Sequence, residues 1–232
     1  TPMLQLVIGN KNYSSWSMRP WVLMRQFGIA FDEVKLRFDT LAYSPDSPFY
    51  RELARHTPAK KVPVLLIDGF AVWDTLAIAE TLADRHREHT LWPKDTLQRA
   101  RARSLCAEMH AGFGALRSHC PMNVEASLPE VGARVLAEQS GARADLARID
   151  AMWSDQVAAS GGPFLFGAFS IADAYYAPVV ARIRTYGLPL SAAARGYADR
   201  VWAAPGVAAW VADALAEKDF LDFEEPYRKS RD

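Results

Sequence analysis

The sequence is poor in cysteine and has no excess of charge of either sign. Its two cysteines, Cys106 and Cys120, cannot build a disulfide framework and lack metal-ligand spacing, so we expect no metal site and a reducing, cytoplasmic location. Lysine plus arginine and aspartate plus glutamate number 27 each, which leaves no net field to attract nucleic acid or an acidic membrane surface. No apolar run reaches the roughly 20 residues of a membrane span, and no signal peptide is recognisable. These absences predict a protein that binds neither nucleic acid nor membranes.

Hydrophobic residues, in contrast, are plentiful. They make up 50% of the 232 residues and include seven tryptophans and eleven phenylalanines, which is enough for a sizeable core. Short strand-like and helix-like runs alternate over residues 3–88, which predicts an α/β domain. Residues 96–232 are rich in alanine and follow helical periodicity, which predicts an all-α domain after a linker that contains Pro93.

The predicted elements of the first domain follow the order βαβ and then ββα. Strands are expected over residues 4–8, 31–38, 64–67 and 71–73, and helices over residues 17–27 and 75–86. Asp68 and Gly69 suit the turn of a hairpin between the last two strands. In the second domain, Ser170 and Asp173 match a capping box, which we interpret as a folding element.

A strand led by proline is the most informative feature of the first domain. Proline cannot donate to a strand ladder, so Pro63 is expected at the first position of its strand. A cis Val62-Pro63 bond would leave the N–H and C=O groups of Val62 facing outward, where they could pair with the backbone of a short peptide. Asp74 and Thr75 open the following helix, where the ammonium and carboxylate groups of that peptide could end. The pattern predicts a site for a small peptide.

A loop rich in serine precedes the first helix. Ser14, Ser15 and Ser17 lie around the helix start, and Arg19 follows one turn in. Serine is a favoured N-cap, which is the structural interpretation, but one cap needs only one serine. The functional interpretation is that one hydroxyl donates to a sulfur anion, assisted by the positive end of the helix and by Arg19. Which of the three serines would face the sulfur is left open.

Together, these motifs resemble those of the cytosolic glutathione transferases, nearest to the zeta-like, serine-type bacterial members. The loop is similar to the serine-cysteine loop of the zeta class and reads Ser14-Ser15-Trp16-Ser17-Met18-Arg19. Residues 57–65 are similar to that class's Asn-Pro-x-Lys-Gln-Val-Pro-x-Leu run. The resemblance implies a thioredoxin-like first domain that binds glutathione as co-substrate, a helical-bundle second domain that carries the electrophile site, and a homodimer.

The resemblance also implies roles for individual residues. Ser14, Ser15 and Arg19 would be catalytic and stabilise the glutathione thiolate. The glutathione-binding residues would be Ser14, Ser17, Lys60, Lys61, Val62, Pro63, Asp74 and Thr75. Among these, Val62 would pair with the backbone of the glutathione cysteine, Asp74 and Thr75 would hold the γ-glutamyl end, and the two lysines would lie near the glycyl carboxylate.

A stripe of mixed character on the first long helix of the second domain is a candidate wall for the second substrate. Helical spacing places on one face Arg103, Cys106, His110, Phe113 and Arg117. In the family, the equivalent helix lines the cleft beside the sulfur. The residues expected to contact the electrophile are therefore Trp16, Arg103, His110, Phe113 and Arg117, whose cationic members suit an acidic or polarised group. The alternative is that the two arginines are solvated and that His110 is a satisfied, partly buried histidine.

The sequence departs from the family at three places. Asp74-Thr75 stands where Glu-Ser or Gln-Ser is usual, and Trp16 stands where the zeta class has the cysteine associated with isomerisation. Ser14 and Ser17 replace the CxxC pair of a thioredoxin, which excludes dithiol exchange. We therefore predict a glutathione S-transferase of detoxification type that activates the thiolate for attack on a small electrophile. The alternatives are a zeta-type isomerase or dehalogenase and a non-catalytic protein that binds glutathione or another ligand.

Overall fold

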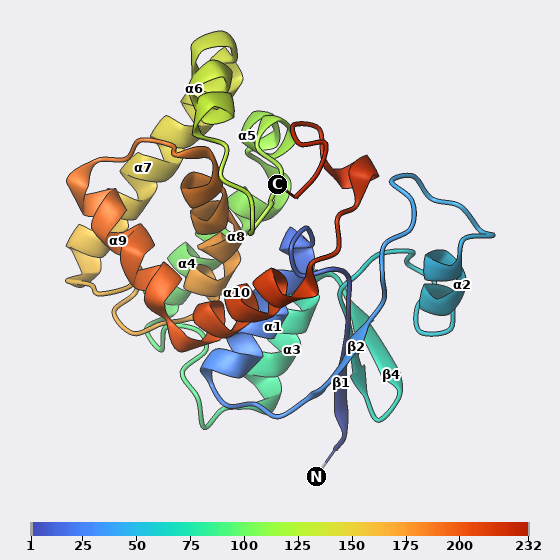
Figure 1. Ribbon diagram of the computed structural model, residues 1–232. Coiled ribbons are helices and arrows are strands. Elements are labelled where there is room, and N and C mark those ends of the chain that lie inside the picture. The colour runs from blue at the N-terminus through green and yellow to red at the C-terminus, as the bar shows by residue number, and fades with distance from the viewer. Residues whose placement is uncertain (1, 232) are drawn as a thin grey trace.

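The computed structural model describes residues 2–231 (Figure 1). Its first elements are β1 (Leu4–Ile8), α1 (Ser15–Gln26), β2 (Asp32–Lys35), α2 (Pro48–Ala54), β3 (Val64–Ile67), β4 (Phe70–Trp73) and α3 (Thr75–Arg85). The elements that follow are α4 (Thr96–Ala111), α5 (Gly114–His119), α6 (Pro129–Glu138), α7 (Ser140–Ser160), α8 (Ile171–Tyr186), α9 (Ala192–Ala203), α10 (Pro205–Glu217) and the 3-10 turn η1 (Asp222–Glu224). The predicted fold class, an α/β domain followed by an all-α domain, is confirmed. Within residues 2–231, none of the helices combines the length and the apolar character that crossing a membrane requires.

The sheet of the first domain has the strand order β2-β1-β3-β4. β1 pairs with β2 in parallel, because the connection through α1 is long enough for a crossover, and β1 pairs with β3 antiparallel. β3 and β4 form the predicted hairpin, and Asp68 and Gly69 at its turn have φ angles of 49° and 82°, as a tight two-residue turn requires. β3 begins at Val64, so Pro63 stands one residue ahead of the strand rather than at its first position.

Helix α2 was not predicted from the sequence. It has only seven residues and begins at Pro48, after the N-cap Ser47 whose Oγ accepts a hydrogen bond from the Tyr50 N–H at 3.1 Å. A helix this short shows no helical periodicity, so the cap was its one sequence signal. The helix covers one face of the sheet with a small core cluster of Val7, Phe49, Leu53, Val64 and Leu66.

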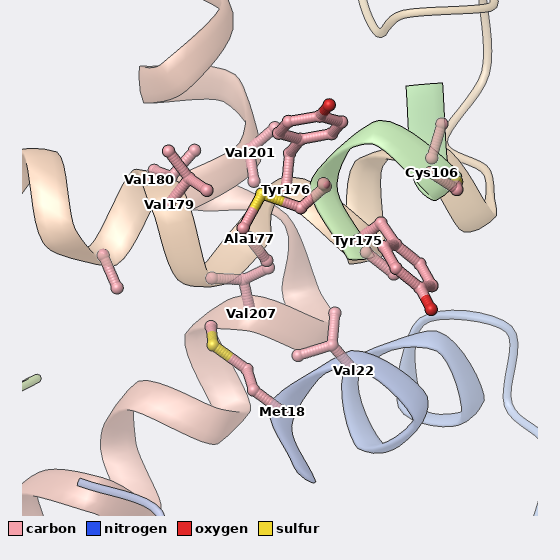
Figure 2. Close-up of a cluster of buried hydrophobic side chains, with 14 of the residues drawn as sticks. Met18, Val22, Cys106, Tyr175, Tyr176, Ala177, Val179, Val180, Val201 and Val207 are labelled. Carbon is pink, nitrogen blue, oxygen red and sulfur yellow. The ribbon is translucent and has the colours of Figure 1, made fainter. Parts of the chain in front are cut away.

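Helix α1 belongs to the first domain in sequence but packs against helices of the second. Met18, Trp21 and Val22 on α1 are fully buried, and α1 lies against α8 and α10. Figure 2 shows Met18 and Val22 in one cluster with Tyr176 of α8 and Val207 of α10. A single hydrophobic core therefore joins the two domains on this side of the sheet.

The N-terminal end of α8 is held by the predicted capping box, which is present. The Ser170 N–H donates to Asp173 Oδ2 at 2.9 Å, and the Leu165 N–H and the Tyr197 hydroxyl donate to Oδ1 at 3.2 and 2.7 Å. Burial raises the pKa of Asp173 to about 6. These bonds fix the start of the helix that carries Tyr175, a residue of the site described below.

The chain beyond α10 returns to the first domain and passes the N-terminal end of α1 (red in Figure 1). The Glu217 carboxylate accepts hydrogen bonds from the backbone N–H groups of Lys11 and Asn12 at 2.7 and 3.0 Å. Arg37 donates two hydrogen bonds to Asp219, at 2.7 and 2.9 Å. The loop ahead of α1 is thus anchored to the second domain as well as to its own sheet.

Candidate functional site

A cavity of about 680 Å³ opens between the two domains, beside the N-terminal ends of α1 and α3. The predicted site residues that line it are Ser14, Ser15, Trp16, Lys60, Lys61, Val62, Pro63, Asp74, Thr75, His110 and Arg117. Three stretches that are far apart in the sequence, the serine loop, the Val-Pro run and the acid-hydroxyl pair, therefore meet in one place. Side chains from α4 and α5 of the second domain complete the cavity.

Ser14 occupies the N-cap position of α1, and its carbonyl oxygen accepts a hydrogen bond from the Met18 N–H at 3.2 Å. Among the described residues its side chain makes no capping hydrogen bond. The Ser14 hydroxyl donates instead to Ser17 Oγ at 2.6 Å, and Ser17 Oγ also accepts from the Gly9 N–H at 3.2 Å. Ser14 lines the cavity and Ser17 is fully buried behind it. The side chain of Ser14 is therefore not used as a helix cap.

The Val62-Pro63 peptide bond is cis, as predicted. Both residues line the cavity, and Pro63 leads directly into β3. Lys60 and Lys61 line the cavity next to them, and the Lys60 Nζ lies 4.2 Å from the centre of the Tyr43 ring. Residues 60–63 therefore line the same cavity as Ser14.

Asp74 and Thr75 stand at the N-terminal end of α3. Asp74 has a φ angle of 75° and caps the helix, since its Oδ1 accepts from the Leu76 N–H at 3.1 Å. Asp74 is exposed, whereas Thr75 is 2% exposed. The positive helix end, a carboxylate and a hydroxyl together suit a ligand that carries both an anion and a cation.

A chain of polar contacts runs behind these two residues. Thr75 Oγ1 lies 2.6 Å from the Tyr175 hydroxyl, which lies 3.0 Å from His110 Nδ1. The other ring nitrogen of His110, Nε2, lies 3.4 Å from Asp74 Oδ1. Burial lowers the pKa of His110, Asp74 opposes this change, and Arg19 and Arg117 add to it. The ring is therefore predominantly neutral at neutral pH.

Two guanidinium groups lie close to the ring of Trp16. The Cζ atoms of Arg19 and Arg117 lie 4.3 and 5.1 Å from the centre of the Trp16 ring. His110 meets the same ring edge-on, with ring centres 4.9 Å apart. Arg117 is partly exposed in the cavity, and its Nη1 donates to the Gly112 carbonyl oxygen at 3.2 Å. Trp16 and Arg117 thus form an aromatic and cationic wall.

Arg19 and Phe113 lie near the cavity but do not line it. Arg19 is 3% exposed, and its Nε donates to the Tyr175 carbonyl oxygen at 3.1 Å. Burial and, to a smaller degree, Arg117 lower the pKa of Arg19 to about 10, so Arg19 remains a cation at neutral pH. Phe113 has a φ angle of 56°, marks the break between α4 and α5, and packs in the main core. The predicted continuous stripe is wrong from residue 112 onward, because α4 ends at Ala111.

Arg103 lies outside the cavity. It makes an ion pair with Glu80 of α3, with Nε and Nη2 donating at 2.7 and 3.2 Å, and its Cζ lies 5.5 Å from the centre of the Trp92 ring. The hydrogen bond to Glu80 raises the pKa of Arg103. Arg103 therefore does not line the cavity with His110: it lies about two turns earlier on the same face of α4, and its guanidinium group is held by Glu80 of α3 and Trp92 of the linker.

The C-terminal segment supplies a further lining residue, Glu224 of η1. Burial raises the pKa of the Glu224 carboxyl group, and the neighbouring charge of Glu225 adds to the effect. Tyr13, the residue before Ser14, also lines the cavity, and its hydroxyl donates to Glu225 at 2.8 Å. The loop ahead of α1 and the C-terminal segment therefore line the same cavity.

Comparison of the chain with models of protein families identifies its family. The family model for the N-terminal domain of glutathione S-transferases matches residues 13–85, and the model for the C-terminal domain matches residues 96–213. The chain belongs to the glutathione S-transferase family. The expected relation to this family is confirmed.

Individual relatives and solved structures show what this glutathione S-transferase family member is similar to. A maleylacetoacetate isomerase from Dictyostelium discoideum is 31% identical over 96 residues, which cover 40% of this chain and 43% of that protein. The chain spans less than half of the length of the curated relatives that it matches. Among solved structures, a glutathione transferase homologue from Burkholderia with bound glutathione has a TM-score of 0.68 at 22% identity, over 92% of this chain and 99% of that one. A maleylacetoacetate isomerase from Anaeromyxobacter dehalogenans has a TM-score of 0.64 at 23% identity, over 96% of each chain.

Several residues in and around the cavity were not predicted from the sequence. They are Tyr13, Phe38, Phe49, Tyr50, Ala59, Trp73 and Glu224, which line the cavity, and Tyr175 behind it. Tyr175 lies in a stretch of α8 in which almost every side chain is buried, so its spacing does not distinguish it from core residues. Tyr13 directly precedes the serine loop, and this adjacency was the one usable signal.

Proposed function

We propose that the protein is a glutathione S-transferase that binds glutathione in this cavity and activates its thiol for attack on a small electrophile. The observation that carries the proposal is Ser14, whose hydroxyl is not used as a helix cap and which lines the same cavity as Val62 and the Asp74-Thr75 pair. A site that needed only to hold a peptide would not require that hydroxyl.

In this proposal the three parts of glutathione bind to three parts of the cavity. The backbone N–H and C=O groups of Val62 pair with the cysteine residue of glutathione, in the manner of an added strand. Asp74 and Thr75 bind the γ-glutamyl end, and Lys60 and Lys61 bind the glycyl carboxylate. Ser14 or Ser15 then lies nearest to the sulfur, at the N-terminal end of α1, where a negative charge is favoured.

Ser17 and Arg19 act behind the sulfur in this scheme. Ser17 Oγ accepts hydrogen bonds from the Gly9 N–H and from the Ser14 hydroxyl, and its own proton is still available. When the Ser14 hydroxyl turns to the sulfur, the Ser17 hydroxyl can donate that proton to Ser14 Oγ. This produces a continuous series of hydrogen bonds from Gly9 to the thiolate. The buried cation of Arg19, one turn into α1, favours the same anion. A thiol of ordinary pKa, about 8.5, is mostly protonated at neutral pH, so both effects increase the reactive fraction.

The electrophile is proposed to lie against Trp16 and Arg117. The thiolate sulfur forms a bond to the electrophilic carbon, the leaving group departs with its electron pair, and the thiol proton has already passed to solvent. The protein itself forms no covalent intermediate, and the rate is raised by the thiolate fraction and by the proximity of the two substrates. A zeta-type isomerase or dehalogenase would use the same glutathione site. Similarity to maleylacetoacetate isomerases favours that alternative, and Trp16 in the place of the zeta-class cysteine opposes it.

We also propose a cytoplasmic homodimer. Large apolar side chains are exposed on β4 and at the start of α4, with Phe70 and Leu97 exposed by 73% and 77%. Pairing of two chains would remove such side chains from water. Sedimentation analysis at increasing protein concentration measures the state directly, and a monomer at every concentration would reject this part of the proposal.

The catalytic proposal is tested by replacing each of the three serines with alanine. We expect Ser14→Ala to lower the conjugation of 1-chloro-2,4-dinitrobenzene and to shift the pH-rate profile upward while glutathione still binds, because the hydroxyl stabilises the thiolate rather than the peptide. Ser17→Ala should give a smaller shift in the same direction. If Ser15→Ala alone abolishes the rate, the donor is Ser15 and the mechanism is retained. If none of the variants changes the rate and no thiolate absorbance is seen at neutral pH, the protein is a non-catalytic binder.

A further inference from the structure

The polar contacts behind the γ-glutamyl site form a chain with both ends in the cavity. It runs from Thr75 Oγ1 to the Tyr175 hydroxyl at 2.6 Å, on to His110 Nδ1 at 3.0 Å, and from His110 Nε2 to Asp74 Oδ1 at 3.4 Å. Thr75, His110 and Asp74 line the cavity, whereas Tyr175 lies behind them and is 1% exposed. The ends of the chain are consecutive residues of the first domain, and its middle comes from α8 and α4 of the second.

The number of protons determines the direction of these hydrogen bonds. Neutral His110 carries one proton, as do the hydroxyls of Thr75 and Tyr175, so three protons serve three contacts. Asp74 is a carboxylate and can only accept, which places the His110 proton on Nε2. His110 Nδ1 then accepts from Tyr175, and Tyr175 accepts from Thr75. Without a ligand, every bond in the chain therefore points from Thr75 toward Asp74.

A bound α-amino acid group reverses this direction. Its carboxylate can only accept, so it takes the Thr75 proton, and Tyr175 must then donate to Thr75. His110 in turn donates from Nδ1 to Tyr175, which leaves a lone pair on Nε2 in the cavity. An ammonium group can only donate, so it can donate to Nε2 and to Asp74 together. The same three protons satisfy both arrangements.

We infer that His110 binds the γ-glutamyl ammonium group of glutathione through Nε2, and that Tyr175 is a positioning residue that links this contact to the bond between Thr75 and the γ-glutamyl carboxylate. This inference deepens the proposed function and rests on it. It moves His110 from the electrophile wall to the glutathione site. It also means that the site recognises a zwitterionic amino acid end as a unit, since each charged group favours the proton arrangement that the other one needs.

Three further observations support this arrangement. Burial, with Arg19 and Arg117 nearby, lowers the pKa of His110, which keeps a lone pair available at neutral pH. Arg19 Nε donates to the carbonyl oxygen of Tyr175 at 3.1 Å, which fixes that residue in place. The edge-on contact with Trp16, with ring centres 4.9 Å apart, fixes the plane of the His110 ring.

The test compares two ligands and four forms of the 232-residue chain by calorimetry at neutral pH. The ligands are glutathione and glutaryl-cysteinylglycine, which has the same carboxylate groups but no ammonium group. The proteins are the wild type, His110→Phe, Tyr175→Phe and, as a matched control, Tyr176→Phe. The Tyr176 hydroxyl donates to the Leu105 carbonyl oxygen at 2.8 Å, and Figure 2 shows that the two neighbouring tyrosines point in different directions.

We expect His110→Phe and Tyr175→Phe to bind glutathione about tenfold or more weakly than the wild type. His110→Phe removes the nitrogen that accepts from the ammonium group, and Tyr175→Phe removes the hydroxyl that directs the His110 proton to Nδ1. Both variants should bind glutaryl-cysteinylglycine at least as tightly as the wild type does, since that ligand has no ammonium group to lose. Tyr176→Phe should bind both ligands like the wild type. An equal loss for both ligands, or no loss for glutathione, would overturn the inference alone. A wild-type protein that binds neither ligand would overturn the proposed function and the inference with it.

Discussion

The Tyr13 hydroxyl donates a hydrogen bond of 2.8 Å to the carboxylate of Glu225, a residue 212 positions later in the chain. The same hydroxyl accepts from the Leu221 N–H at 3.3 Å, and burial raises the Tyr13 pKa to about 12. Glu225 also accepts from Asn123 Nδ2 at 2.9 Å and from Arg228. The residue before Ser14 is therefore held by the C-terminal segment.

We expect Tyr13→Phe to lower the free energy of unfolding by about 1 to 2 kcal/mol, because it removes one donor and one acceptor in a buried network. It should also lower kcat of conjugation, since the backbone that orients Ser14 loses its anchor. Tyr227→Phe is the matched control. The Tyr227 hydroxyl donates to the His119 carbonyl oxygen at 2.5 Å in the same segment, away from the serine loop. Denaturant unfolding and steady-state kinetics measure both effects, and equal losses of kcat in the two variants would contradict a local role for Tyr13.

Asp74→Asn is expected to weaken glutathione binding by about tenfold or more, because it removes the charge that attracts the ammonium group. Asparagine tolerates the positive φ of this position and can still accept from the Leu76 N–H, so the start of α3 should be preserved. Thr75→Val should also weaken binding, through the loss of the hydroxyl. Ser170→Ala serves as the control, since it removes a capping residue of α8 and should lower the melting temperature with little change in affinity. Calorimetry that shows unchanged affinity in a folded Asp74→Asn protein would reject the assignment.

Glutathione affinity is expected to fall as the pH is lowered through the pKa of His110. The groups that face its ring are Asp74 ahead of α3, Arg19 of α1, Arg117 of α5 and Tyr175 of α8. Burial is the largest influence and lowers this pKa, so the midpoint should lie below the ordinary value of about 6.5. Protonated His110 cannot accept from the ammonium group and pairs with Asp74 instead, so affinity is full above the pKa and lost below it. Calorimetry from about pH 7.5 to pH 5 should show this loss in the wild type and a flatter profile in His110→Phe.

Arg117→Gln should raise the KM for an anionic electrophile such as 4-chloro-3,5-dinitrobenzoate about fivefold or more, because a charged contact is lost. The KM for neutral 1-chloro-2,4-dinitrobenzene should change much less. Arg103→Gln is the control, since Arg103 pairs with Glu80 outside the cavity and should affect neither substrate. Equal changes for both electrophiles would show that Arg117 acts on the fold rather than on the substrate.

The parts of the fold and the site that could be predicted depend on local rules. Proline excludes a strand interior, two residues with positive φ make a hairpin turn, and a hydroxyl three residues before an acid caps a helix. Pro63, the Asp68-Gly69 turn and the Ser170-Asp173 box follow from these rules, which need only neighbours in sequence.

The parts that could not be predicted depend on contacts between distant segments. Tyr175 and Thr75 are 100 residues apart, and nothing near Tyr175 distinguishes a tyrosine that bonds to the site from one that fills the core. The stripe from Arg103 to Arg117 failed for a related reason, because the prediction assumed one unbroken helix. Phe113 adopts a left-handed conformation that leaves no mark in the spacing of apolar residues.

The core that α1 shares with α8 and α10 has a consequence for how the chain can be divided. Met18, Trp21 and Val22 would become exposed to water in a fragment of residues 3–88, at a cost of about 1.5 to 3 kcal/mol for each large side chain. The sequence boundary near residue 90 is therefore not a boundary of folding, and the whole chain is expected to melt as one cooperative unit. A chimaera that joins the first domain of one relative to the second domain of another would keep both sets of site residues. It would still fail to fold unless its α8 and α10 came from the same relative as its α1, because these helices share one core.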